Sequence, residues 1–250
     1  MYYYLFESAK NSRDKKTQEK IKRVTINLGI AGENVSPSPA RTIDELIDIG
    51  LTKGYSTFVA VGSDLFANKI ITGLLNNTQY KDKIAFGFIP YDTNVSALAK
   101  IIDFENYEQA CQNLRFRYLK KQDVSLLFPN KYFITPINIS AGSVFSVHII
   151  HPNFEAVSSA TDVNINPDLK ISWTDKNYAM SKFQAFINKF NKKMINNDSY
   201  SQITASEIKI ETSPSLQVYL SNEVIAKTPI KIKLLHNYLQ IIVNRDKIAS

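Results

Sequence analysis

The feature of this sequence that most constrains its fold is a change of pattern near residue 122. Before that point, apolar runs typical of buried strands, such as Tyr55–Val61 and Ile84–Ile89, alternate with amphipathic segments typical of helices. One helix is predicted to begin after Thr42, because Thr42 and Glu45 have the spacing of a capping box. Strands that alternate with helices in this way usually lie parallel in an α/β layer. Residues 1–122 are therefore predicted to form an α/β domain with a parallel sheet.

The second part of the chain has a different pattern. It contains short runs rich in β-branched and aromatic residues, separated by turn residues, as in Phe145–Ile150 and Ile230–Leu235. One helix is expected to interrupt these runs near residues 180–194. We therefore predict a second domain over residues 123–250, an antiparallel β-sandwich.

Composition limits the class of protein. The 250 residues are 44% hydrophobic and 21% charged, which excludes a disordered or collagen-like chain. The single cysteine, Cys111, cannot form an internal disulfide, and no apolar run approaches the ~20 residues of a membrane helix. The N-terminus lacks the basic start of a signal peptide, so a cytoplasmic protein is expected. The net charge of +7 favours anionic partners, namely nucleotide phosphates, nucleic acid or acidic lipid headgroups.

The histidines do not form a catalytic or zinc-binding set. His148 and His151 flank two apolar residues of a predicted strand, so their side chains point to opposite faces. The sequence also contains no G-x-S-x-G elbow and no G-x-x-x-x-G-K-[ST] phosphate loop. No metal-ligating residues can be assigned from the sequence.

The most informative segment for function is the turn that follows the strand Tyr55–Val61. Gly62 and Ser63 form this turn, and Asp64 lies where the next helix begins. A helix N-terminus can receive a phosphate, because its first N–H groups lack partners and its dipole is positive there. Asp64 has two open interpretations: it caps a helix, or it holds Mg²⁺ directly or through water.

Residues 59–74 resemble, position by position, the motif G-G-D-G-T-x-N-E-x-x-N-G-L of the diacylglycerol kinase catalytic family of lipid kinases. The matching residues are Gly62, Asp64, Asn68, Gly73 and Leu74, and the differing ones are Ser63, Leu65, Phe66, Lys69 and Thr72. Pro90–Asn94 is similar to the family's P-x-G-T-x-N motif, with Asp92 in place of glycine. Ser221–Glu223 is similar to the family's C-terminal Asp-Gly-Glu, of which Glu223 matches.

The resemblance implies a fold of the NAD-kinase and diacylglycerol-kinase type. It also implies transfer of the γ-phosphoryl group of ATP to the hydroxyl of a diacylglycerol-like lipid, with Mg²⁺, in a cleft between the two domains. By resemblance, Glu223 is the catalytic base and Asp64 is the second catalytic carboxylate. Glu7–Asn11 takes the place of the family's N-P-x-x-G phosphate-binding loop. The residues expected to contact the nucleotide are Gly62, Ser63, Asp64, Thr93 and Ser36.

The differences from the family motif support an alternative. Leu65 and Phe66 stand where the family has Gly-Thr, so bulk replaces a small residue and a hydroxyl group. Ser221 removes one acidic group from the third motif. These changes leave open a catalytically inactive pseudokinase that keeps the scaffold and binds nucleotide, lipid or a protein partner. If the turn still accepts phosphates, the side chains of Leu65 and Phe66 must turn away into the core.

A third interpretation is a basic module that binds nucleic acid, which would need basic residues interleaved with aromatic ones. Only Arg115–Lys121 has that pattern, and we interpret it as an edge or linker strand rather than a nucleic-acid site. The basic segment Lys10–Arg23 is interpreted either as the solvated face of a helix or as an anion-binding face beside the first strand. Basic residues of this kind also suit an anionic membrane surface, so peripheral membrane contact is part of the prediction.

Overall fold

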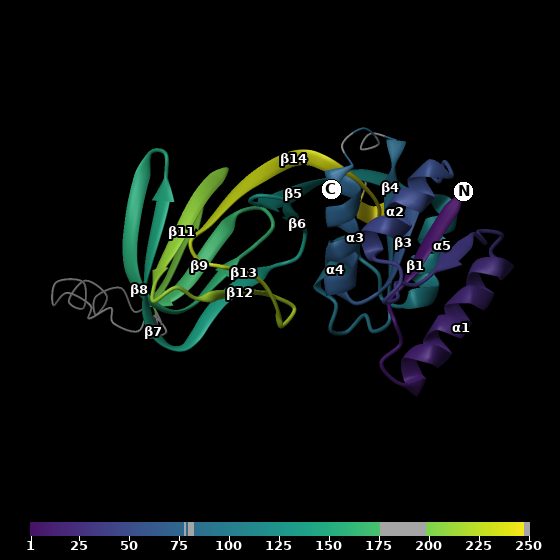
Figure 1. Ribbon diagram of the computed structural model, residues 1–250, viewed down its shortest axis with the longest axis horizontal. Helices are drawn as coiled ribbons and strands as arrows, with labels where there is room; N and C mark the ends of the chain where they lie inside the picture. Colours follow the sequence, from purple (N-terminus) through teal and green to yellow (C-terminus); the bar gives the residue numbers. More distant parts are fainter. Residues whose placement is uncertain (78, 80–82, 176–198, 248–250) are drawn as a thin grey trace. The chain divides into compact units, whose positions relative to one another are not determined.

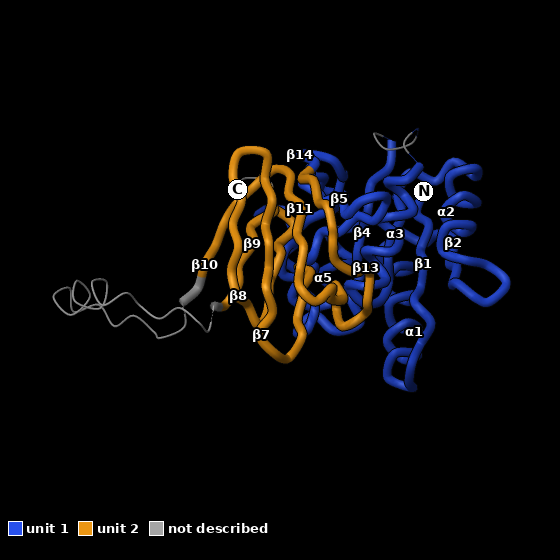
Figure 2. Tube along the Cα trace, turned by 60° about the vertical axis from the view of Figure 1, so that its left-hand side comes forward, with its two compact units in different colours: residues 1–135, 235–250 blue, residues 136–234 orange. Residues whose placement is uncertain are grey.

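The computed structural model describes residues 1–77, 79, 83–175 and 199–247. The chain forms two compact units: unit 1 comprises residues 1–135 and 235–250, and unit 2 comprises residues 136–234 (Figure 2). The bounds of these units differ from the expected domains, 1–122 and 123–250. The helix expected near residues 180–194 lies outside the described residues.

Unit 1 is an α/β layer built on parallel strands (Figure 1). The strands are β1 (Tyr2–Phe6), β2 (Glu33–Val35), β3 (Thr57–Gly62), β4 (Ala85–Pro90), β5 (Leu119–Leu127) and β6 (Lys131–Phe133). The helices are α1 (Ser12–Asn27), α2 (Ile43–Thr52), α3 (Asp64–Asn76), α4 (Ala97–Ile102) and α5 (Tyr107–Phe116), followed by the 3-10 turn η2 (Arg245–Lys247). The strand order β2-β1-β3-β4 is parallel throughout, which confirms the predicted sheet. Helix α1 packs with α5, and α2 packs with α3.

Two contacts place the boundary of unit 1 beyond residue 122. The β5–β6 hairpin lies against α3, and the side chain of Asn68 on α3 donates a hydrogen bond to Thr135 just after this hairpin. The last strand, β14 (Ile230–Ile242), begins in unit 2 and ends in unit 1, where it pairs in parallel with β4. Both contacts join segments far apart in the sequence, so local patterns do not detect them.

Local sequence does explain where the helices begin. Thr42 and Glu45 form the predicted capping box at α2: the Thr42 hydroxyl accepts from the N–H of Glu45, and the Glu45 carboxylate accepts from the N–H of Thr42. The side chains that cap α1, α3, α4 and α5 are those of Asn11, Ser63, Ser96 and Asn106. None of the described helices is long and apolar enough to span a membrane.

The segment Arg115–Lys121 is not a single strand. Helix α5 continues through Phe116 and ends at Arg117, which has a left-handed backbone conformation with φ of 52°. Strand β5 begins only at Leu119. The interpretation of the whole segment as an edge or linker strand is therefore wrong for its first residues, because the helical pattern before them extends further.

The core of unit 1 lies between its sheet and its helices. Strands β3 and β4 are buried along their whole length. Helix α3 contributes Phe66, Ile70 and Leu74 to the same core, with Phe66 only 4% exposed. Gly73 lies where α3 meets α2, and a Cβ atom there would be 2.5 Å from Cδ1 of Ile47. Two positions shared with the kinase motif, Gly73 and Leu74, thus have packing roles in this fold.

Unit 2 consists of antiparallel strands, as predicted. Its sheet has the order β10-β9-β8-β7-β11-β14, and β12 pairs with β7 and with β13. Along β7, residues Ile137, Ile139, Val147 and Ile149 are buried, which is the pattern of a strand with one face on a core. The strands are β7 (Ile137–His151), β8 (Phe154–Ile165), β9 (Lys170–Asp175), β10 (Ser199–Thr204), β11 (Glu207–Ser213), β12 (Gln217–Leu220) and β13 (Glu223–Lys227).

Candidate functional site

The candidate site is the turn Gly62–Asp64, called here the glycine turn, between β3 and α3. Gly62 is the last residue of β3, and Ser63 is the N-cap of α3. The Ser63 hydroxyl accepts a hydrogen bond of 3.3 Å from the N–H of Phe66, which is an ordinary helix cap. The side chain of Phe66 points into the core of unit 1, and Leu65 is half-buried. Phe66 therefore turns away from the glycine turn, as expected for a turn that accepts phosphates, whereas Leu65 is buried only in part.

Asp64 is buried, with 7% of its surface exposed, and its carboxylate binds the start of α4. It accepts hydrogen bonds from the Ser96 hydroxyl at 2.5 Å, the N–H of Ala97 at 2.7 Å and the N–H of Leu98 at 3.2 Å. These contacts satisfy N–H groups at the N-terminus of α4 and place a negative charge at its positive end. Asp64 thus caps a helix, but the helix is α4 rather than its own α3. A metal ion bound by Asp64 would have to compete with these three donors.

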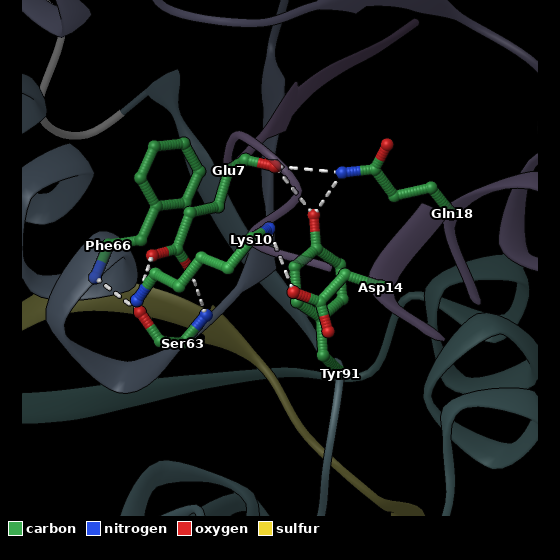
Figure 3. Close-up of polar contacts among 7 residues, drawn as sticks. All are labelled: Glu7, Lys10, Asp14, Gln18, Ser63, Phe66 and Tyr91. Atoms are coloured by element: carbon green, nitrogen blue, oxygen red, sulfur yellow. Dashed lines mark hydrogen bonds and ion pairs between the residues drawn. The ribbon is translucent and has the colours of Figure 1, made fainter. Parts of the chain in front are cut away.

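A second carboxylate, that of Glu7, lies at the glycine turn (Figure 3). Its Oε2 atom accepts a hydrogen bond of 2.7 Å from the N–H of Ser63, and its Oε1 atom lies 3.5 Å from Nζ of Lys10. Gly62 allows this approach, because a Cβ atom there would lie 2.6 Å from both Cβ and Oε2 of Glu7. The side chain of Glu7 therefore occupies the N–H group at which a phosphate would be expected.

The backbone of Glu7 is held as firmly as its side chain. Its carbonyl oxygen accepts from the Tyr91 hydroxyl at 2.7 Å and from Nε2 of Gln18 at 2.8 Å, and Gln18 also donates to the Tyr91 oxygen at 2.5 Å (Figure 3). Burial raises the pKa of Tyr91 to about 12, and the negative charge of Glu7 adds to this rise, so the hydroxyl stays a neutral donor. The segment after β1 is thus tied both to α1 and to the end of β4.

The segment that takes the place of the N-P-x-x-G loop is an ordinary start of a helix. The Asn11 side chain accepts from the N–H of Asp14 at 2.9 Å, and the Asp14 carboxylate accepts from the N–H of Lys10 at 3.0 Å. These two bonds fix the path of residues 7–11 between β1 and α1. The backbone N–H groups of Lys10 and Asp14 in this segment therefore already have side-chain acceptors.

The other expected nucleotide contacts lie on separate loops of unit 1. Ser36 directly follows β2 and is exposed. Thr93 follows β4 and is half-buried, and its hydroxyl donates a hydrogen bond of 2.7 Å to the carbonyl of Glu105. Because these loops follow the C-terminal ends of parallel strands, they belong to the same edge of the sheet as the glycine turn.

Glu223, the expected catalytic base, belongs to unit 2. It is the first residue of β13 and pairs with Leu220 of β12 across the two residues Ser221 and Asn222. Those two residues have φ angles of 48° and 69°, which is the geometry of a tight hairpin turn with two left-handed residues. The substitution of the family's Asp-Gly by Ser-Asn thus keeps a hairpin at this position. The joint role of Glu223 and Asp64 stays a prediction.

Unit 1 also contains a cleft of about 490 Å³, called here the α1 cleft. Its α1 wall consists of Ser12, Arg13, Lys16, Thr17 and Lys20, and the rest of its lining is residues 90–94 after β4 and residues 106–107 at the start of α5. Thr93 and Tyr91 both line it, so it lies beside the contacts that hold Glu7. Among the described residues, no group of three or more His, Cys, Asp or Glu side chains could hold a metal ion.

No protein-family model matches this chain, and no curated protein matches it in sequence. Solved structures do match. A candidate diacylglycerol kinase from Bacillus anthracis str. Sterne gives a TM-score of 0.76 at 16% sequence identity, over 98% of each chain. A structure described as a diacylglycerol kinase from the same organism gives 0.72 at 17% identity, over 98% of this chain and 97% of that one.

This chain has the diacylglycerol kinase fold. Yeast NADH kinase complexed with NADH is a more distant match, with a TM-score of 0.52 at 6% identity over 98% of this chain and 84% of that one. The fold class inferred from the sequence, a parallel α/β part followed by antiparallel strands, is thereby confirmed. At the glycine turn of this chain, the N–H group of Ser63 donates a hydrogen bond to the Glu7 carboxylate.

Three residues of the site, Glu7, Gln18 and Tyr91, were not among the site residues expected from the sequence. A partial signal existed for two of them, because Glu7 stands in the segment that corresponds to the N-P-x-x-G loop and Tyr91 stands inside the second motif. Gln18 had no local signal. Its role depends on a contact with Tyr91, which is 73 residues away in the sequence.

Proposed function

We propose that this protein is a catalytically inactive relative of the lipid kinases, which keeps their fold and binds an anionic ligand without transferring phosphate. One observation carries the proposal: the Glu7 carboxylate accepts the hydrogen bond of the Ser63 N–H. A phosphate at the glycine turn would need that donor and would meet a like charge beside it. Like charges at contact distance disfavour one another strongly where water is scarce.

The residues expected to hold ATP and Mg²⁺ do not fit these groups as they stand. Glu7 occupies the Ser63 N–H, and the Asp64 carboxylate is engaged by three donors at the start of α4. Phosphoryl transfer depends on N–H donors and metal ions positioned on the phosphates. At both places the partner is one of this chain's own groups, so neither the Ser63 N–H nor the Asp64 carboxylate is open to ATP or Mg²⁺.

One observation favours the second candidate function, ATP-dependent phosphoryl transfer to the hydroxyl of a diacylglycerol-like lipid. Phe66 is packed in the core, so this large side chain does not cover the glycine turn. Transfer would require Glu7 to leave Ser63, with Asp64 and Glu223 as catalytic residues and with Gly62, Ser63, Thr93 and Ser36 near the nucleotide. Contact with an anionic membrane through the basic residues of α1 is compatible with either candidate.

A phosphotransfer assay tests the proposal. The wild-type protein is incubated with labelled ATP, Mg²⁺ and diacylglycerol in mixed micelles, and labelled lipid is measured. We expect no product above background. Labelled lipid that forms with the wild type and is lost in Glu223→Gln would show that the protein is a kinase and would overturn the proposal.

A binding measurement tests the observation behind it. In Glu7→Ala the Ser63 N–H is released and a negative charge is removed, so ADP affinity at the turn should rise by about tenfold, the effect of one charge-assisted hydrogen bond. Glu19→Ala is the matched control, because Glu19 is an exposed carboxylate on α1 that pairs with Lys22. Equal ADP affinity in wild type, Glu7→Ala and Glu19→Ala would show that Glu7 does not close the turn.

A further inference from the structure

The α1 cleft combines space for a small ligand with a concentration of positive charge. Its volume of about 490 Å³ lies within the range of small-molecule sites. Three cationic side chains line it, those of Arg13, Lys16 and Lys20, against one carboxylate, that of Asp92. The lining side chains thus carry a net charge of about +2, which attracts anions into a partly enclosed space.

The positions of these cations on α1 explain why they share one wall. Arg13, Lys16 and Lys20 are separated by three and four residues, so they follow one another along the same face of the helix. Thr17, which has a hydroxyl group, lines the cleft between them. Cationic and hydroxyl donors on successive turns suit an oxyanion with several acceptor oxygens.

The cations are available to a ligand. Within the described part of the chain, neither Lys16 nor Lys20 forms an ion pair. Arg13 reaches Asp92 only at 3.8 Å, with 82% of the arginine side chain exposed. Exposed pairs of this kind contribute little to stability, so a dianionic ligand could displace this contact. In contrast, Lys10, Lys22 and Lys53 each lie within 3.5 Å of a carboxylate oxygen.

The opposite wall is uncharged apart from Asp92 and is held in place. Thr93 is fixed by its bond to the Glu105 carbonyl, and the Asn106 side chain caps α5 by accepting from the N–H of Gln109. The aromatic residues of this wall are Tyr91 and Tyr107, and each has a pKa raised to about 12, so both remain neutral at physiological pH. The cleft therefore has one side for an anionic group and another for a neutral body that can lie against tyrosine rings.

We propose that the α1 cleft binds a phosphate monoester, with the phosphate on Arg13, Lys16 and Lys20 and the rest of the ligand toward Tyr91 and Tyr107. This assigns a site and a chemical class to the ligand binding proposed above, and it does not depend on whether phosphate is transferred. The monoester is either a free metabolite or the headgroup of an acidic lipid. Both present the same dianion to the same wall.

The test measures binding of three phosphate monoesters to the full chain: AMP, glycerol 3-phosphate, and phosphatidic acid in phosphatidylcholine vesicles. Adenosine, glycerol and pure phosphatidylcholine vesicles are the matched ligands without the monoester. We expect saturable binding of at least one monoester and none of its partner. Which monoester binds distinguishes a nucleotide, a small polar phosphate and a lipid headgroup.

Two variants locate the binding in the cleft. Lys16→Gln/Lys20→Gln should weaken binding by about tenfold or more, because two charge-assisted hydrogen bonds are lost. The control Lys15→Gln/Arg23→Gln removes two exposed cations of α1 that do not line the cleft, and its effect should stay below about threefold because exposed charges are screened by salt. Thr17→Trp leaves the charge unchanged but fills the cleft, and it should also abolish binding. Circular dichroism confirms that each variant is folded.

Three results would overturn this proposal. The first is the absence of binding to all three monoesters, and the second is an equal loss of affinity in the cleft variant and its control. The third is binding that persists in Thr17→Trp but changes in Glu7→Ala, which would assign the anion to the glycine turn. None of these results depends on the phosphotransfer assay, so a failure here is distinct from a failure of the proposed loss of transfer.

Discussion

The glycine turn and the α1 cleft are two places in unit 1 where an anion is expected, and they differ in what already occupies them. At the turn, the N–H of Ser63 donates to the Glu7 carboxylate, and the Asp64 carboxylate is used by α4. In the cleft, Lys16 and Lys20 have no ion pair among the described residues. In this chain the residues of the kinase-like motif lie at the glycine turn, whereas the cationic donors available to an anion lie in the α1 cleft.

The largest effect on stability is expected from a change at Leu65 and Phe66. Leu65→Gly/Phe66→Thr restores the family's Gly-Thr, but it removes a side chain that is 4% exposed in the core. The free energy of unfolding should fall by about 4 kcal/mol, mainly from truncation of a buried Phe. Urea unfolding followed by circular dichroism measures this loss. ADP affinity should not rise; binding that appears only in the double variant would show that these residues, and not Glu7, close the turn.

Asp64→Ala should produce the next largest effect. The change leaves the Ser96 hydroxyl and the N–H groups of Ala97 and Leu98 without their acceptor at a buried helix start, so the free energy of unfolding should fall by about 3 kcal/mol. Asp48→Ala, an exposed change on α2, should lower it by less than about 1 kcal/mol. A carboxylate kept for a metal would behave differently, because its removal would leave stability unchanged or higher.

Gly62→Ala tests whether the Glu7 side chain lies over the glycine turn. The new Cβ would meet the Glu7 carboxylate and would strain a backbone with φ of 156°, so we expect a loss of about 2 kcal/mol in unfolding free energy. Part of this loss should disappear in a Glu7→Ala background. The coupling in the double-mutant cycle should be about 1 kcal/mol, as for residues in contact. Full additivity would mean that Glu7 does not lie over Gly62 in solution.

The last expected effect appears only at high pH and concerns Tyr91, which touches both regions. Its pKa is raised from an ordinary value near 10 to about 12, so folding favours the protonated hydroxyl. The corresponding stabilisation is fully present below pH 10 and is lost as the pH rises through 12. We expect wild type to lose more unfolding free energy than Tyr91→Phe over this interval. Parallel pH profiles for the two proteins would show that Tyr91 titrates normally.

The sequence was sufficient for features set by neighbouring residues. The alternation of strands and helices predicted the parallel sheet, and Thr42 and Glu45 predicted the start of α2. Each of these depends on the period of one helix or strand, or on a contact within a few residues.

Contacts between distant segments were not predictable in the same way. Ser63 and Glu7 are 56 residues apart, and Asp64 and Ser96 are 32 apart, so neither bond has a local pattern. The end of unit 1 has no local signal for the same reason, since β14 returns to pair with β4. The motif gave the position of the glycine turn, while the partners that fill it are determined by the tertiary structure.

The burial of Phe66 also limits how this turn could change by mutation. A route from Leu65-Phe66 to the Gly-Thr of the kinase motif must pass through a variant in which the core lacks the Phe66 ring. Such a variant would lose a large part of the roughly 5–15 kcal/mol that keeps a typical protein folded. The step from Phe66 to Thr is therefore disfavoured by folding itself. The packing of Phe66 in the core of unit 1 thus also preserves the present sequence of the segment after the glycine turn.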